Sequence, residues 1–408
     1  MVSASYRPED PGYKQNAGEH GYPQGPQRNV DVPELGFEHV WEQTTANDRT
    51  IAICESGFPQ LTHEDLRARF PPGTDQDPKR AVLPVRSQIV QREGRDVISV
   101  TNPEFDPSKP GSHATAVAGV VAATHNNGRG IAGATQASVF AAPYNLEGRG
   151  LSTNPQEAVH AFEAAVAAYE LRRKADNLSV INLSSSTLGS TEFLEKLTGA
   201  VTAAADERNV LIVTAVGNPV QIGDEIVKRT SCFAADSRTI TVQVCFETLT
   251  LPSLRTLVTG PEVNVTAPGI DVLTTWYDGT QSNRTDLYRR IAGTSFATPV
   301  VSGIAALCLD VHPEQTMEQL RTRLKATTID GVMDGVPAEH VGEGVVSAAK
   351  AIAAPPGQLT VQTTTPDHPP DQQPVDVETD QFEDGGVTLE TETATWTPER
   401  VGEDPIVR

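Results

Sequence analysis

Short apolar runs alternate with longer segments of helical pattern between residues 49 and 353, and this alternation limits the possible folds most strongly. Strands that are buried on both faces appear as continuous apolar runs, and helices then cover the two faces of the sheet. The pattern predicts an α/β domain with a mostly parallel sheet and helices on both faces. The expected strands are residues 49–54, 137–142, 179–183, 210–216 and 239–244. The expected helices are residues 113–123, 156–174, 191–207, 295–311, 318–327 and 344–353.

The two ends of the chain differ in composition from the stretch between them. Residues 1–34 are rich in Pro, Gly, Gln and Asn, which predicts an extended N-terminal arm without a core of its own. Residues 355–408 are rich in Pro, Thr, Gln and acidic residues. They predict a solvated acidic tail with room for one short strand within residues 387–396. The globular domain is expected to span residues 35–354.

The net charge of −21 excludes two classes of partner. Nucleic acids and anionic membrane surfaces attract basic proteins, so neither is an expected partner. The sequence has no apolar run of the roughly 18 residues that a membrane span needs, so no membrane-spanning helix is expected. The first residues lack a basic start followed by an apolar stretch, which favours a cytoplasmic protein. A secreted protein is the alternative if the natural start lies upstream.

The cysteines Cys54, Cys232, Cys245 and Cys308 show no metal-ligand spacing. Cys54 and Cys308 lie inside apolar runs, where a free thiol behaves as a small apolar side chain. Free thiols are therefore expected. A disulfide between Cys232 and Cys245 stays open as the alternative.

Four polar residues occupy places where an α/β sheet commonly carries its active site. Glu55 and Asn218 follow two of the expected strands, and His113 and Ser295 begin two of the expected helices. The carboxyl ends of parallel strands meet at one edge of a sheet, so these side chains are expected to converge there. Taken singly, each has a structural alternative: a satisfied buried acid, a structural histidine, a turn asparagine and a serine helix cap.

The segments around these residues together resemble the subtilase family of serine peptidases. The order acid, histidine, asparagine, serine is that of the family, and the serine and histidine segments read GTSFATPVVSG (293–303) and GSHATAVAG (111–119). Further similar segments are LTHEDL (61–66), VINLS (180–184), VTAPG (265–269) and GEGVV (342–346). The resemblance covers residues 35–354. It implies a subtilisin-like three-layer α/β sandwich that requires no cofactor.

The resemblance also implies roles for individual residues. Ser295 would be the nucleophile, His113 the general base, Glu55 the acid that orients it, and Asn218 an oxyanion donor beside the Ser295 N–H. The partner would be an extended polypeptide, bound along strand edges. The expected substrate-binding residues are Gly148, Gly150, Ser184, Ser185, Ser186, Ala215, Val216 and Gly217.

Several positions depart from the family pattern. Glu55 stands where the family has Asp, and Ala114 where it usually has Gly. A glutamate is also found in the related sedolisins, but these lack the catalytic histidine and the oxyanion asparagine. Ala116 and Phe296 are similar to the mycosins of actinobacteria, although the membrane anchor of mycosins is missing. Glu55 leaves open an alternative function, a catalytically impaired pseudoprotease that acts as a peptide-binding or assembly module.

Two further expectations concern calcium and the chain ends. Asp65 and residues 126–127 occupy positions where some subtilases bind calcium, and a solvated loop is the alternative. Residues 1–34 are too short for a packed prodomain, but they could lie in the active cleft as an inhibitory strand. The acidic tail could serve assembly.

Overall fold

The computed structural model describes residues 6–13, 23, 25–55, 57–84, 86–92, 95–101, 104–143, 177–184, 202, 205–206, 209–222, 225–228, 230–279, 287–355, 359 and 387–390. The expected helix 156–174 and most of the expected helix 191–207 lie outside these residues.

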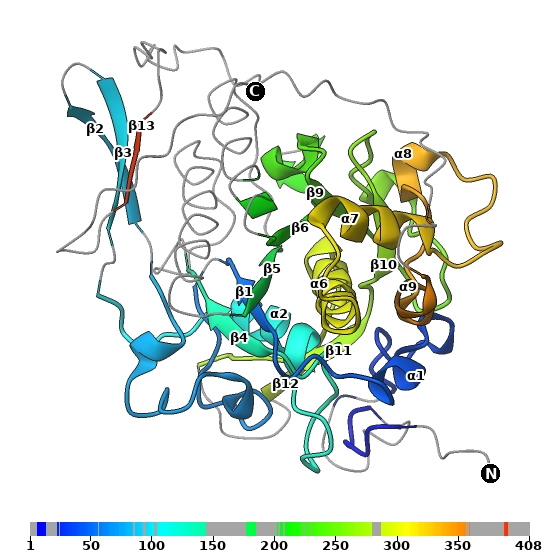
Figure 1. The fold of residues 1–408 in the computed structure, drawn as a ribbon, viewed down its shortest axis with the longest axis horizontal. Helices are drawn as coiled ribbons and strands as arrows, with labels where there is room; N and C mark the ends of the chain where they lie inside the picture. The colour runs from blue at the N-terminus through cyan, green and yellow to red at the C-terminus, as the bar shows by residue number, and fades with distance from the viewer. Residues whose placement is uncertain are drawn as a thin grey trace.

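A six-stranded parallel sheet forms the centre of the described structure (Figure 1). Its strand order is β10-β9-β6-β5-β1-β4, and every pairing is parallel. All five expected strands are confirmed, and β10 is an addition. The strands are β1 (Thr50–Ile53), β4 (Ser138–Ala141), β5 (Leu178–Leu183), β6 (Leu211–Ala215), β9 (Thr239–Cys245) and β10 (Val265–Pro268).

Two helices of small and β-branched residues pack on this sheet and on each other. They are α2 (Ser112–Ala122) and α6 (Thr294–Val311), and both begin with residues expected to carry the site. Shorter helices complete this side of the molecule: α1 (Phe37–Trp41), α7 (Met317–Ala326), α8 (Ala338–Val341) and α9 (Ala348–Ala353). Single 3-10 turns occur at Pro33–Leu35, Arg67–Arg69, Pro78–Arg80, Cys232–Ala235 and Leu254–Thr256.

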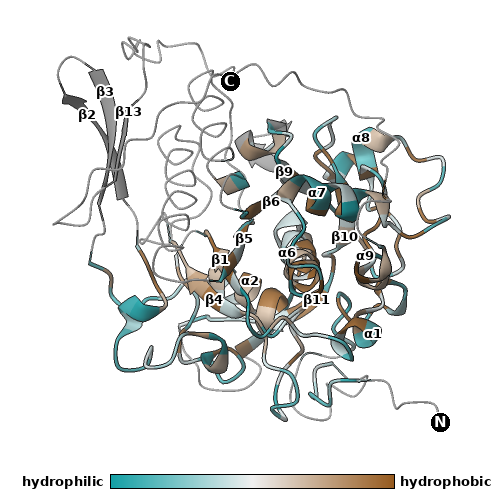
Figure 2. Cartoon of the chain, in the orientation of Figure 1, coloured by the Kyte–Doolittle hydropathy of each residue, from teal (hydrophilic) through white to brown (hydrophobic). Residues whose placement is uncertain are grey.

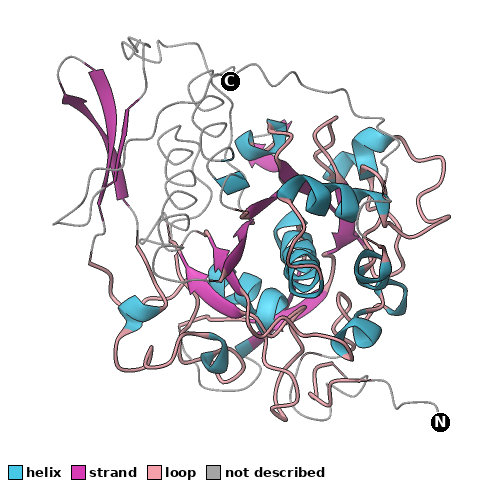
Figure 3. Cartoon of the chain, in the orientation of Figure 1, coloured by secondary structure: helices cyan, strands magenta, loops and turns pink. Residues whose placement is uncertain are grey.

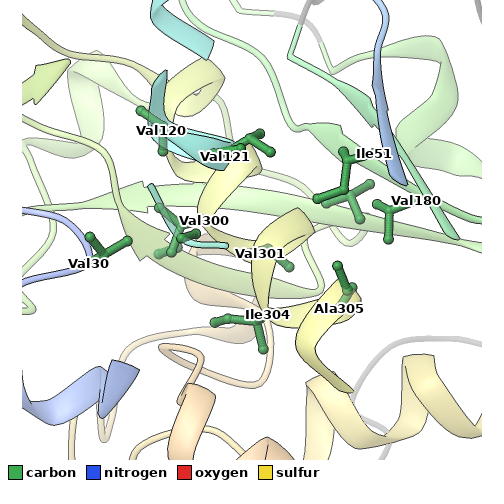
Figure 4. Close-up of a cluster of buried hydrophobic side chains, with 14 of the residues drawn as sticks. Val30, Ile51, Val120, Val121, Val180, Val300, Val301, Ile304 and Ala305 are labelled. Carbon is green, nitrogen blue, oxygen red and sulfur yellow. The ribbon is translucent and has the colours of Figure 1, made fainter. Parts of the chain in front are cut away.

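Helix α6 is mostly apolar because it crosses the core (Figure 2). By length and composition it could cross a membrane, but 89% of it is buried inside the protein. Its side chains Val300, Val301 and Ile304 lie in one cluster with Ile51 of β1 and Val180 of β5 (Figure 4). It is therefore the core helix of the domain.

Three small antiparallel sheets lie outside the central one, and the three-stranded one is at the left edge in Figure 3. One of them joins a hairpin to the acidic tail, because the tail strand pairs with the second hairpin strand. The short strand expected within residues 387–396 is thus confirmed. The three sheets are β2 (Arg86–Arg92), β3 (Arg95–Thr101) and β13 (Val387–Glu390); β7 (Val220–Ile222) and β8 (Glu225–Val227); and β11 (Val272–Thr275) and β12 (Tyr288–Ile291).

Cys54, Cys245 and Cys308 are buried thiols and are not joined in disulfides. Burial raises the pKa of all three, that of Cys308 to about 12, so the thiols are neutral and unreactive. Because Cys245 is free, the alternative of a disulfide with Cys232 is wrong.

Residues 6–13 and 25–35, here called the N-terminal strap, differ from the expected free arm. Tyr13, Val30 and Leu35 of the strap are at most 2% exposed and belong to the main core. The described parts of the N-terminal stretch are therefore packed into the domain.

Hydrogen bonds to buried groups hold the strap in place. The side chain of Gln27, itself fully buried, donates to the carbonyl of Ala132 and accepts its N–H. The carboxylate of Asp10 accepts the N–H groups of Asn126 and Asn127 at 2.7 and 3.0 Å. These hydrogen bonds thus fix the strap to the loop that follows α2.

We expect Gln27→Ala to lower the free energy of unfolding by about 2 kcal/mol, because the N–H and carbonyl of Ala132 would lose their buried partners. Equilibrium unfolding in urea measures this change. Gln76→Ala, at an exposed position, is the matched control and should have little effect. A Gln27→Ala protein as stable as the wild type would show that the strap is not part of the folded domain.

Candidate active site

The candidate nucleophile, Ser295, lies in the first turn of α6 and is 7% exposed. The first N–H groups of a helix have no carbonyl partner within it, so the Ser295 N–H is a donor at the positive end of the helix dipole. The preceding loop is held by β10, since the N–H of Gly293 donates to the carbonyl of Gly269 at 2.9 Å. A side chain at Gly269 would approach the N atom of Ala297 to 2.7 Å, so only glycine fits there.

The candidate base, His113, lies in the first turn of α2. Its Nδ1 is 2.8 Å from Oε2 of Glu55, which follows β1. Gly57 allows Glu55 and His113 to approach each other. Its φ of 86° turns the chain, and a side chain at this position would lie 3.2 Å from the Cα of Gly111, the residue just before α2. The imidazole is 39% exposed while the carboxylate is 1% exposed, so the base is accessible and its partner is not.

Glu55 changes the proton affinity of His113. Burial alone would lower the pKa of His113, but the charge and the hydrogen bond of Glu55 outweigh burial and raise this pKa above its usual range. The second oxygen of Glu55, Oε1, is buried and has no hydrogen-bond partner among the described residues. The carboxylate is therefore directed to the imidazole through one oxygen only.

Phe296 brings the two helix starts together. It follows Ser295 directly, and its ring packs against the His113 imidazole with centroids 5.3 Å apart. The base of α2 and the nucleophile of α6 thus share one apolar contact. The sequence pattern did not predict this role for Phe296, because its neighbour across the site lies on another helix.

Asn218 follows β6 and is oriented by the residue before Ser295. Its Oδ1 accepts the N–H of Thr294 at 3.1 Å, and the Thr294 hydroxyl donates to the carbonyl of Gly217 at 3.1 Å. With Oδ1 so fixed, the Nδ2 amide is the end of the side chain that is left to donate to an oxyanion. Thr294 was not among the predicted site residues; its position beside Ser295 is the only sequence signal for it.

The predicted substrate-binding residues are only partly described. Gly148, Gly150, Ser185 and Ser186 lie outside the described residues. Ser184 is fully buried at the end of β5 and accepts a hydrogen bond from Asn182. Ala215 and Gly217 are buried beside Asn218.

Val216 is another of the residues expected to line the substrate pocket. Its side chain is fully buried in a cluster with Val258 and Val263. Its N–H donates to Val242, and its carbonyl accepts the N–H of Ser231.

Asp65, the expected calcium ligand, has both carboxylate oxygens in hydrogen bonds. Oδ1 accepts the Asn127 side-chain amide at 2.7 Å, and Oδ2 accepts the Ile131 N–H at 2.9 Å. Burial raises the pKa of Asp65 well above its usual range. In the part of the chain that the structure describes, no group of three or more His, Cys, Asp or Glu residues could hold a metal ion. As arranged, these residues stabilise the loop after α2 through hydrogen bonds.

The fold is shared with solved peptidase structures. A protease from Pseudoalteromonas arctica superposes with a TM-score of 0.56 at 21% identity, covering 85% of this chain and 98% of that one. Fervidolysin from Fervidobacterium pennivorans superposes with a TM-score of 0.55 at 18% identity, covering 87% and 50%.

The sequence is similar to named peptidases. Halolysin from Haloferax mediterranei is 29% identical over 79% of this chain and 53% of its own length. A subtilisin from Bacillus pumilus is 32% identical over 57% of this chain and 74% of its own length. The chain spans about half the length of several of these relatives. The model of the subtilase family matches residues 46–351, which is most of the described domain and includes all four candidate residues; the chain therefore belongs to the subtilase family.

Proposed function

We propose that this chain is a serine endopeptidase, with Ser295, His113 and Glu55 as its catalytic triad. The observation that carries the proposal is the hydrogen bond between His113 Nδ1 and the buried Glu55. The ring of His113, at the start of α2, also contacts Phe296, the residue after Ser295. A carboxylate on Nδ1 leaves Nε2 of the neutral imidazole as the proton acceptor, which is what a general base beside a serine needs.

The proposed reaction proceeds through an acyl-enzyme. As Ser295 Oγ bonds to the peptide carbonyl carbon, His113 Nε2 takes the hydroxyl proton, and Glu55 stays an anion that stabilises the imidazolium. Asn218 Nδ2 and the Ser295 N–H hold the oxyanion. His113 then gives the proton to the leaving amine as the C–N bond breaks. Water, deprotonated by His113, hydrolyses the ester and restores Ser295.

We expect Asn218→Ala to lower kcat by about 10²–10³ with little change in KM, the scale known for an oxyanion donor of subtilisin. The donor acts on charge that develops only in the transition state, so substrate binding is spared. Steady-state kinetics with a chromogenic peptide measures both constants. An unchanged kcat would mean that other groups hold the oxyanion.

The proposed substrate is extended polypeptide, bound by main-chain hydrogen bonds along the chain that continues from Ser184. Two relatives are named as extracellular enzymes, the extracellular protease of Xanthomonas campestris and the halolysin-like extracellular serine protease of Natrialba magadii. We therefore propose that the chain acts outside the cytoplasm; the expected cytoplasmic location has no support from these relatives.

The N-terminal strap is proposed to stabilise the domain, and not to inhibit it. His113 is the second residue of α2, whereas Asp10 and Gln27 of the strap bind the loop that follows the last residue of this helix. The eleven residues of α2 separate the two ends by about 16 Å. The described strap contacts therefore lie away from the imidazole.

Incubation of the purified chain with a denatured protein tests the proposed function. Mass spectrometry of the products should show new termini produced by hydrolysis of internal peptide bonds. A folded, monodisperse preparation that leaves the substrate intact would contradict it.

A further inference from the structure

Asn182 of β5 is a fully buried amide at the centre of the catalytic elements, and the proposed mechanism makes no use of it. Its main chain pairs with Ile53 of β1 and Val213 of β6. Its carbonyl accepts the N–H of Cys54, the residue before Glu55, at 2.9 Å. Asn182 is therefore fixed to the strand that presents the acid.

The side chain of Asn182 reaches two further elements. Its Nδ2 donates to Ser184 Oγ at 2.8 Å, where the proposed substrate strand begins. Its Oδ1 accepts the hydroxyl of Ser302 of α6 at 2.9 Å. Ser302 comes seven residues after Ser295, which is two helical turns along the same helix. One amide thus joins the nucleophile helix to the end of the substrate strand.

The contact with Ser302 is the last step of a buried polar ladder along α6. The Ser302 hydroxyl also approaches the carbonyl of Thr298 at 3.1 Å, and the Thr298 hydroxyl donates to the carbonyl of Thr294 at 2.8 Å. Thr294 in turn orients Asn218 through its N–H. Thr294, Thr298 and Ser302 are each at most 1% exposed. These bonds alternate between side chains and the main chain of α6, so Asn218 and Ser184 are both tied to the same helix.

Hydrogen bonds constrain the position of α6 in a way that its apolar packing does not, and at the far end of the helix Asp310 also bonds to Thr44 and Arg49. Val300, Val301 and Ile304 pack into the core, and apolar packing is favourable over a range of small displacements. A buried amide with an unmatched donor or acceptor costs about 1–3 kcal/mol, so the Asn182 bonds disfavour a shift of α6 against β5.

We propose that Asn182 is a positioning residue that sets Ser295 and the oxyanion donor at the right distance from the substrate strand. The proposal rests on the proposed peptidase function. Asn182 itself touches neither the substrate nor the reacting atoms. The competing role is that of a polar core residue that contributes stability alone.

Ser302→Ala and Asn182→Leu separate the two roles. Both substitutions remove the hydrogen bond between α6 and β5. Ser302→Ala disturbs the packing less, so it still tests the proposal if Asn182→Leu does not fold. We expect kcat/KM for an extended peptide to fall about tenfold in Ser302→Ala and up to about a hundredfold in Asn182→Leu, the scale of a misplacement near 1 Å. The pH at which activity rises should not change, because Glu55 and His113 keep their contact.

The double variant should lose no more activity than Asn182→Leu alone, since both changes break one link. Thr241→Val is the matched control: its hydroxyl is equally buried in β9 but bonds to Ala234, away from α6. It should lower the melting temperature without lowering kcat/KM.

Suppose that the wild type is an active peptidase. The positioning role of Asn182 would then be overturned if folded Ser302→Ala kept its full kcat/KM, or if Thr241→Val lost as much kcat/KM as Ser302→Ala. A wild type without peptidase activity would overturn the proposed function, and with it this inference.

Discussion

Replacing Ser295 with alanine is expected to remove peptidase activity, lowering kcat by about 10⁶, the scale known for the nucleophile of subtilisin. The hydroxyl is the only atom group that the change removes, so no acyl-enzyme can form. Hydrolysis of a chromogenic peptide under single-turnover conditions measures the loss. Ser295 is 7% exposed in a helix turn that tolerates alanine, so the variant should fold.

Ser302→Ala makes the same chemical change on the same helix, and its expected loss of about tenfold is far smaller than the loss of about 10⁶ expected for Ser295→Ala. Undiminished hydrolysis by Ser295→Ala would assign the nucleophile elsewhere.

Glu55→Gln is expected to lower kcat by about 10⁴, because an amide favours the wrong tautomer of His113 and cannot stabilise imidazolium. Glu55→Asp should retain activity, since it keeps the anion. Glutamate is one methylene longer than the aspartate usual in the family, and its Oε2 lies 2.8 Å from His113 Nδ1.

The pH profile gives a second measure of the same contact. His113 must be neutral to accept a proton, so activity rises with pH through the pKa of His113. Glu55 raises this pKa, so the residual activity of Glu55→Gln should rise at lower pH than that of the wild type. Equal rates and an unshifted profile for Glu55→Gln would show that Glu55 is not the partner of the base.

The central sheet could be predicted because its signal is local. Runs such as residues 211–215 are apolar and β-branched, and the structure places all five expected strands within one sheet. The helix starts at Ser112 and Thr294 were also predicted to within one residue. Small residues around His113 and Ser295 indicated close packing, and the structure has it.

The parts of the fold and of the site that were not predicted depend on contacts between residues that are distant in the chain. The strap has few large apolar residues, but Gln27 pairs with Ala132, more than one hundred residues away. Strands β11 and β12 are short, and they pair with each other in a two-stranded sheet. Asn182 and Thr294 are polar residues in buried positions, and composition alone cannot identify the hydroxyl or amide that satisfies each one.

The central claim is that Ser295 is an activated nucleophile. The most direct measurement is covalent labelling of the purified chain with a fluorophosphonate, followed by intact-mass analysis and peptide mapping. The account predicts one adduct per folded chain, on Ser295, and none on Ser295→Ala or on the heat-unfolded chain. A folded chain that takes up no label, or that is labelled at another residue, would contradict it.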